Sequence, residues 1–171
     1  IVVWLALLWS EKANEKGNER YILIIAYMIG LATGLHLLNL LTIPFVALLI
    51  YFRKFKFEWT SFGILVALTG LVFFIIHNVI IKGMPKIADA IGVPLTGLLI
   101  IAIFAGMVWA ILNHKQLISI VLTSMVLILI GYSTYALIFI RSNQDPGIDE
   151  NDPETVEAFI SYLEREQYGD V

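Results

Sequence analysis

The chain has 171 residues, 59% of them hydrophobic, with a net charge of −3 and no cysteine. A soluble domain averages about 45–50% apolar residues, whereas several apolar runs here approach or exceed the roughly 20 residues that cross a bilayer, which excludes an ordinary soluble domain. The missing cysteines exclude disulfides and thiolate sites, and the largest polar segment is acidic and would repel phosphates, which excludes nucleic-acid binding.

The first predicted element is an apolar run over residues 1–9. This run is too short to cross a bilayer, and we expect it to be the truncated end of a transmembrane helix that starts upstream of Ile1. The chain is therefore expected to be an internal fragment of a longer protein. A charged loop follows over residues 10–20, in which acids and bases balance.

The next apolar stretch, residues 21–52, is long for one membrane span and short for two. Pro44 removes a backbone donor and disfavours helix at the residue before it, so we expect a break near residues 39–44. Two interpretations stay open. We favour a broken pair of partial helices over residues 21–41 and 43–52, because broken helices are tolerated where they face protein or a water-filled cavity. The alternative is one kinked span.

Three uninterrupted spans are predicted after this stretch, over residues 60–81, 95–112 and 117–140. Lys and Arg in short loops favour the cytoplasm, so the most basic loop, RKFKFE at residues 53–58, is placed inside. Alternating crossings then put the connector at residues 82–94 outside, the loop at 113–116 inside, and residues 141–171 outside. The lysines of the connector oppose this orientation, but the rule is statistical and the other loops favour it.

The chain changes character at Ile140–Arg141, where a water-soluble segment begins. Residues 141–171 hold nine acids against two bases, a net charge of −7, whereas residues 1–140 carry a net charge of +4. Asp152 is a good N-cap, and apolar residues then recur with helical spacing, so we expect an amphipathic helix over residues 153–166. Its apolar face needs a partner, which we expect to be another extracytoplasmic loop or the surface of the membrane domain.

No self-contained catalytic motif occurs in the chain, so polar residues in apolar surroundings are the candidates for substrate binding. His36 and Asn39 share a helix face and can line a substrate cavity, or they can satisfy backbone groups near the break. His77 and Lys82 lie at the outer end of a span, where a cation can bind a lipid-linked phosphate or simply reach the interface. Arg141 can bind phosphate through two parallel hydrogen bonds or serve as an interfacial anchor.

Carboxylates gather in the acidic segment. Asp149, Glu150 and Asp152 are weak candidates for ligands of a divalent cation. Their spacing does not match an EF-hand loop, and charged runs are usually solvated, so no metal site is assigned.

Three strings of the sequence, taken together, resemble one family. They are GLATGLHLLNLLTIP (residues 30–44), GYSTYALIFIRSNQDPGIDENDPE (131–154) and YLEREQYGD (162–170). The chain resembles, over essentially its whole length, a family of large multi-spanning proteins common in Bacteroidota. That family is grouped with the GT-C glycosyltransferases and includes an animal protein O-mannosyltransferase. The polar strings are the most specific, because membrane composition alone gives little reason for them.

The resemblance implies an all-α, polytopic transmembrane helix bundle of GT-C type in a bacterial inner membrane, with a short extracytoplasmic acidic segment. It implies an enzyme that takes a sugar, mannose or a related hexose, from a polyprenyl-phosphate donor and passes it to Ser/Thr of exported proteins. The lipid-linked sugar phosphate is then a substrate, and no further cofactor is implied. Enzymes of this type carry the catalytic carboxylate in the first extracytoplasmic loop, so that residue is expected upstream of Ile1.

Two other function classes stay open. A non-catalytic scaffold subunit would use the acidic segment and its amphipathic helix to dock an extracytoplasmic partner. A transporter would use the broken helix and the intramembrane polar residues, although no paired inverted repeat is visible.

Overall fold

Helices make up the regular structure in the computed structural model, which describes residues 1–33, 37–164, 166 and 169. No strand occurs in those residues, which confirms the predicted all-α class. In chain order the elements are α1 (Val2–Glu11), α2 (Glu19–Thr33), the 3₁₀ helix η1 (Leu37–Leu41), α3 (Thr42–Lys54), α4 (Trp59–Phe74), the π-helix η2 (Ile75–Ile81), α5 (Gly83–Ile91), α6 (Val93–Leu112), α7 (Gln116–Tyr132), the 3₁₀ turn η3 (Ser133–Tyr135), α8 (Ala136–Ser142) and α9 (Val156–Glu164).

Three stretches in the described part of the chain are long and apolar enough to cross a membrane. They are Trp59–Ile81 (α4 with η2), Val93–Leu112 (α6) and Gln116–Ser142 (α7, η3 and α8). At most 17% of each apolar window is buried within the chain itself. Apolar helices that are exposed on most sides need lipid or further helices around them, which indicates a membrane protein.

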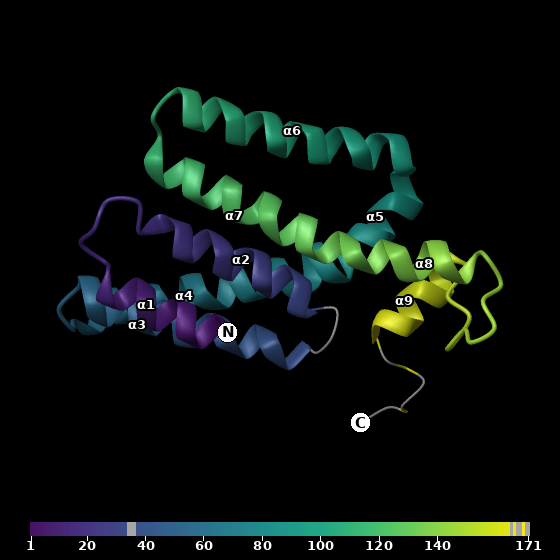
Figure 1. Cartoon of the computed structure of the whole chain (residues 1–171), viewed down its shortest axis with the longest axis horizontal. Coiled ribbons are helices and arrows are strands. Elements are labelled where there is room, and N and C mark those ends of the chain that lie inside the picture. Colours follow the sequence, from purple (N-terminus) through teal and green to yellow (C-terminus); the bar gives the residue numbers. More distant parts are fainter. Residues whose placement is uncertain (34–36, 165, 167–168, 170–171) are drawn as a thin grey trace.

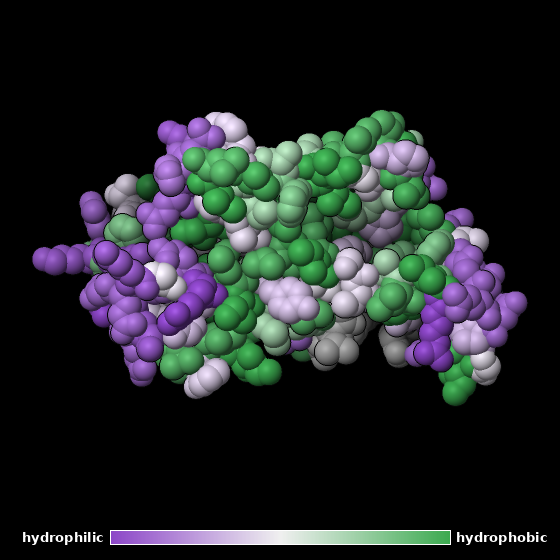
Figure 2. Space-filling view, turned by 45° about the horizontal axis from the view of Figure 1, so that its top comes forward, coloured by the Kyte–Doolittle hydropathy of each residue, from purple (hydrophilic) through white to green (hydrophobic). Residues whose placement is uncertain are grey.

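The helices run up and down, so the polar segments gather at two opposite ends of the bundle (Figure 1). We call one of these the basic end, comprising residues 10–20, 53–58 and 113–116. The other, the acidic end, comprises α5, α8, residues 143–155 and α9. Figure 2 shows hydrophilic residues at both ends and a hydrophobic band between them, the pattern expected of a chain that crosses a bilayer.

Hydrogen bonds join the ends of neighbouring helices at the basic end. Nε of Arg53 donates to the carbonyl of Ser10 over 2.8 Å, and Nε2 of Gln116 donates to Oε1 of Glu19 over 2.7 Å. Lys and Arg outnumber Asp and Glu by three at this end. The net positive and net negative charges of the chain therefore lie on opposite sides of the apolar band.

The apolar stretch at residues 21–52 forms a pair of antiparallel helices. α2 ends at Thr33, α3 begins at Thr42, and the chain reverses direction between them (Figure 1). Two separate helices therefore occupy this stretch, and α2 ends before residues 39–44, where the break was predicted. Pro44 lies in the first turn of α3, where its missing N–H costs no helical hydrogen bond, so the proline begins the second helix and does not end the first.

Two glycines let α2 and α7 cross at close range. Gly30 faces the backbone of Ile128, and Gly131 faces the backbone of α2. A Cβ at Gly131 would lie 2.6 Å from the Leu31 nitrogen and 2.7 Å from the Tyr27 carbonyl oxygen. The close approach therefore requires glycine at both positions, as in other membrane helix pairs.

Two tyrosines satisfy helix ends next to this crossing. The hydroxyl of Tyr132 donates to the carbonyl of Ile81 over 2.7 Å, and that of Tyr135 donates to the carbonyl of Thr33 over 2.8 Å. Ile81 and Thr33 are the last residues of η2 and α2, and carbonyls at helix ends need partners outside the helix. The tyrosines therefore link the junction of α7 and η3 to the ends of η2 and α2.

The amphipathic helix α9 begins at Val156, later than predicted. The predicted N-cap, Asp152, has a φ of 45°, whereas an N-cap residue normally lies in the β region. Thr155 caps the helix instead, because its hydroxyl accepts the N–H of Ala158 over 3.1 Å. The helix therefore starts at Val156 rather than at about residue 153.

The apolar face of α9 packs within the chain. α9 contacts the connector helix α5, and its residues Phe159 and Leu163 are buried. The rings of Phe159 and Phe139 meet edge to face, with their centroids 5.7 Å apart. The partner of this face is thus a loop helix together with α8 of the membrane domain.

Candidate functional site at the acidic end

The acidic segment is held against the end of the last span. Oγ of Ser142 donates to Oδ2 of Asp149 over 2.6 Å, and Nδ2 of Asn143 donates to the carbonyl of Glu154 over 3.2 Å. Ser142 is only 1% exposed, and Pro153 is also fully buried. Residues 143–155 therefore form a folded cap on α8, which gives the acidic groups defined positions.

Arg141 lies on the exposed side of α8 and lines an open hollow. The other lining residues are Leu137, Ile140, Gln144 and Pro146. Aliphatic walls beside a guanidinium suit an amphipathic ligand that carries an anionic group, because guanidinium binds such groups through parallel hydrogen bonds.

Three carboxylates of the cap lie close together. The ligand atoms of Asp149, Asp152 and Glu154 are within 4.8 Å of one another. This trio includes two of the three predicted weak metal candidates and replaces Glu150 with Glu154. Carboxylate oxygens are the ligands that hard cations prefer, but an exposed acidic cluster alone does not specify a metal.

Mutual repulsion in this cluster affects the protonation of Glu154. The negative charge of Asp152 is the main cause that raises the pKa of Glu154, and partial burial and the charges of Asp145 and Asp149 add to it. Repulsion among the carboxylates of the cap thus disfavours the charged form of Glu154.

His77 lies near the end of the span Trp59–Ile81, and Lys82 directly follows that span. The ring of His77 stacks on Phe73, with centroids 6.0 Å apart and planes 15° apart. The backbone N–H of Lys82 donates to the carbonyl of His77 over 3.2 Å at the end of η2. Neither His77 nor Lys82 is among the residues that line the hollow at Arg141. The three residues predicted to bind phosphate therefore do not share this hollow.

Asn39 has a structural role in this arrangement. Its Nδ2 donates to the carbonyl of Ala32 near the end of α2 over 3.2 Å, and its own carbonyl accepts the hydroxyl of Thr42 over 2.6 Å. These contacts correspond to backbone satisfaction at the break, the alternative to a cavity lining. The other residue of the predicted pair, His36, lies outside the described residues.

The tyrosines and Glu154 are the residues that sequence reasoning did not single out. Gly131 and Tyr135 lie four apart, a spacing that places both on one helix face, and this was the available signal for their shared contact with α2. No comparable signal marks Glu154, because its approach to Asp149 depends on the irregular backbone between them.

Two of the strings that carry the family resemblance meet in space. Gly30 and Thr33, from residues 30–44, contact Gly131 and Tyr135, from residues 131–154. Parts of these two strings thus lie side by side where α2 and α7 cross.

Comparison with known proteins adds a match at the N-terminal part of the chain. Residues 1–59 match the family model for the N-terminal domain of the protein O-mannosyl-transferase TMEM260. These residues comprise α1, α2, η1, α3 and the turn that leads into α4. No curated protein and no solved structure matches the chain. About the first third of the chain is therefore similar to a domain of a protein O-mannosyltransferase.

Proposed function

We propose that the chain is part of an integral-membrane glycosyltransferase that moves a sugar, mannose or a related hexose, from a polyprenyl-phosphate donor to Ser/Thr of exported proteins. The observation that carries this proposal is the match of residues 1–59 to the N-terminal domain of a protein O-mannosyl-transferase. The resemblance of the three sequence strings extends the proposal to a GT-C-type enzyme of a bacterial inner membrane.

The fold supports this proposal in its outline. A lipid-linked donor keeps its chain in the bilayer and its phosphate at the surface, so its site must lie where an apolar band meets polar groups. The acidic end has this character, since Arg141 follows directly after the last apolar residues of α8. Loop charges favour the basic end as the cytoplasmic one, which leaves the acidic end facing the exported acceptors.

The chemistry of the transfer asks for two kinds of group. The acceptor hydroxyl attacks the anomeric carbon, its proton passes to a base, and the sugar–phosphate C–O bond breaks with both electrons leaving on the lipid phosphate. A cation beside that phosphate stabilises the negative charge that develops there. We assign Arg141 to this position and place Lys82 and His77 as secondary candidates. No residue of the chain is assigned as the base.

Sugar transfer by the full-length protein tests the function. The protein is reconstituted with polyprenyl-phosphate-linked radiolabelled mannose and a Ser/Thr peptide, and radioactivity on the peptide is measured. We expect transfer by the wild type, and we expect Arg141→Ala to raise the KM for the donor by about tenfold or more, because it removes a charged hydrogen-bonding partner.

Arg20→Ala, which removes an arginine from the opposite end, serves as the matched control and should leave the donor KM unchanged. Absence of transfer from any polyprenyl-phosphate sugar would reject the proposed function. Transfer with an unchanged donor KM in Arg141→Ala would reject only the role of Arg141.

The scaffold alternative used the acidic segment and the amphipathic helix to dock an extracytoplasmic partner. Phe159 and Leu163 on the apolar face of that helix are buried within the chain and are not available to such a partner. The transporter alternative relied on the broken helix and on intramembrane polar residues, of which Asn39 satisfies backbone groups.

A further inference from the structure

We propose that the turn between α3 and α4 binds the headgroups of anionic phospholipids at the membrane surface of the basic end. This proposal goes beyond the transferase function and does not depend on it. We call residues 51–62 the basic-aromatic turn. Six aromatic rings and three cations define it: Tyr51, Phe52, Phe55, Phe57, Trp59 and Phe62, with Arg53, Lys54 and Lys56.

Most of the rings of the turn are exposed although they touch one another. Every residue from 52 to 60 is exposed, and the exposed fraction reaches 78% at Trp59 and 62% at Phe55. The ring centroids of Phe57 and Trp59 lie 5.1 Å apart. A contiguous aromatic surface is unfavourable in water, whereas aromatic rings are favoured at the headgroup level of a bilayer.

Tyr51 holds the turn in one conformation. It is only 4% exposed, and its hydroxyl lies 2.6 Å from Oγ of Ser61 and accepts the backbone N–H of Glu58 over 3.2 Å. Its ring stacks on Phe55 with centroids 5.9 Å apart. The rings and cations are thus presented on a folded surface, which lowers the entropy cost of binding.

The position of the turn along the bundle fixes its depth in a membrane. The apolar span Trp59–Ile81 begins inside the turn, and α3 ends at Lys54 immediately before it. Residues 53–58 therefore lie just outside the hydrocarbon layer when that span crosses the membrane. This is the depth of phospholipid headgroups.

The cations of the turn have no carboxylate partners among the described residues. Arg53 uses Nε to bind the Ser10 carbonyl, and Nζ of Lys54 lies 5.4 Å from the centroid of the Trp9 ring. Neither contact neutralises a charge, and Glu58 is the only acid in the turn. A partner that brings negative charge at headgroup depth complements this surface.

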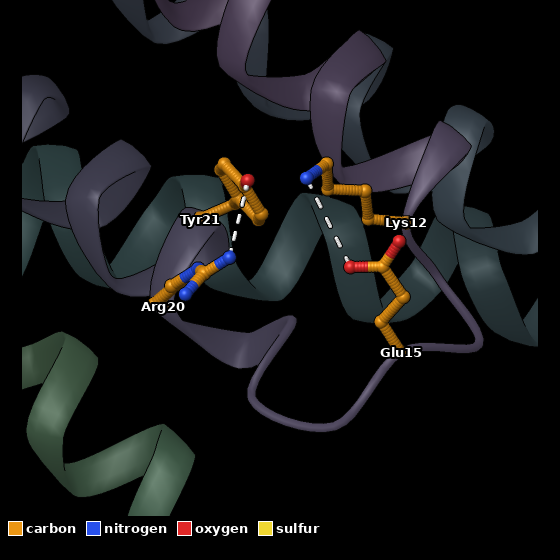
Figure 3. A network of polar contacts seen from close by, with 4 residues as sticks. All are labelled: Lys12, Glu15, Arg20 and Tyr21. Carbon is orange, nitrogen blue, oxygen red and sulfur yellow. Dashed lines mark hydrogen bonds and ion pairs between the residues drawn. The ribbon is translucent and has the colours of Figure 1, made fainter.

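The neighbouring loop at the same end differs in this respect. Lys12 forms an ion pair with Glu15 at 3.9 Å, and Arg20 donates to the Tyr21 hydroxyl over 3.5 Å (Figure 3). Acids and bases balance in that loop, so the net positive charge of the basic end concentrates on the turn. Each cation near an anionic membrane surface strengthens association by about fivefold.

The test uses full-length protein whose only cysteine replaces Thr60 and carries a bimane fluorophore. The protein is reconstituted into phosphatidylcholine vesicles that contain a fixed fraction of either brominated phosphatidylglycerol or brominated phosphatidylcholine. We expect stronger quenching by the brominated phosphatidylglycerol. The preference should fall at high salt, which screens the charges, and Lys56→Gln should lower it by up to about fivefold.

Lys16→Gln is the matched control, because it removes one exposed lysine from the balanced loop of the same end; it should lower the preference less than Lys56→Gln does. A triple variant, Arg53→Gln with Lys54→Gln and Lys56→Gln, should abolish the preference. If that variant fails to fold, Lys56→Gln and the salt titration decide the question. Equal quenching by the two lipids in the wild type, or an equal loss in Lys16→Gln and Lys56→Gln, would overturn the proposal.

Discussion

Gly131 and Tyr135 lie one helical turn apart, and both contact α2. The glycine removes the side chain that would otherwise separate the two backbones, and the tyrosine then reaches the carbonyl of Thr33 at the end of that helix. In hydrocarbon an unsatisfied carbonyl costs several kcal/mol. The close approach of the helices at Gly131 thus allows the hydrogen bond from Tyr135 to Thr33.

Replacing Gly131 with alanine tests this packing. The added Cβ would overlap the backbone of α2, so we expect Gly131→Ala to destabilise the protein by about 1–3 kcal/mol. Gly97→Ala is the control, because nothing lies within 4 Å of a Cβ at that position, and alanine there should be neutral or slightly stabilising. Thermal unfolding in detergent measures both, and equal melting temperatures for the two variants would contradict the close crossing.

Glu154 gives a prediction about pH. Its pKa is raised in the folded cap, chiefly by Asp152, so protonation favours the folded form. The stabilisation is fully present below the unfolded pKa and is lost as the pH rises through the raised folded pKa. Glu154→Gln, which mimics the protonated group, should therefore increase protection of residues 143–155 from hydrogen exchange at neutral pH.

The difference between Glu154→Gln and the wild type should shrink as the pH falls below about 4, where the wild-type carboxyl is itself protonated. Glu157→Gln is the control, since an acid in the first turn of α9 is favourable and its loss should not increase protection. Unchanged protection in Glu154→Gln at neutral pH would mean that the carboxylates do not repel one another in the cap.

The sequence was informative about helices and less so about their ends. The predicted span of residues 60–81 coincides with Trp59–Ile81. An uninterrupted apolar run of about 20 residues satisfies its backbone in a membrane by forming a helix that crosses it. The end of α2 could not be predicted in the same way, since no proline or charge marks Thr33. A tyrosine about 100 residues away satisfies its carbonyl, and such a contact leaves no local pattern.

The start of α9 offers a direct comparison between two possible caps. Thr155→Ala should reduce helix stability by about 1 kcal/mol, because it removes the acceptor for the Ala158 N–H. Asp152→Ala should leave the helix unchanged, because Asp152 lies outside it. Hydrogen exchange of the amides in Val156–Glu164 measures the effect of both variants on helix stability. A larger loss of protection in Asp152→Ala than in Thr155→Ala would show that Asp152 is the N-cap, as predicted from the sequence.

The molecule as a whole separates charge across an apolar band, and this separation was readable from the sequence through the basic loop RKFKFE and the acidic residues after Ile140. The candidate site was only partly readable. Arg141 stands out because it follows a long apolar run, whereas the grouping of Glu154 with Asp149 and Asp152 arises from an irregular backbone path that no periodicity describes.

Sided labelling of the membrane protein tests the central claim, that the acidic end faces the exported acceptors and the basic end faces the cytoplasm. Cysteines are introduced one at a time at Gly147 in the acidic cap and at Asn14 in the basic end, and intact cells are treated with a membrane-impermeant thiol reagent. We predict that Gly147→Cys is labelled from outside and that Asn14→Cys is labelled only after permeabilisation. Labelling of Gly147→Cys only after permeabilisation would contradict both the orientation and the proposed function.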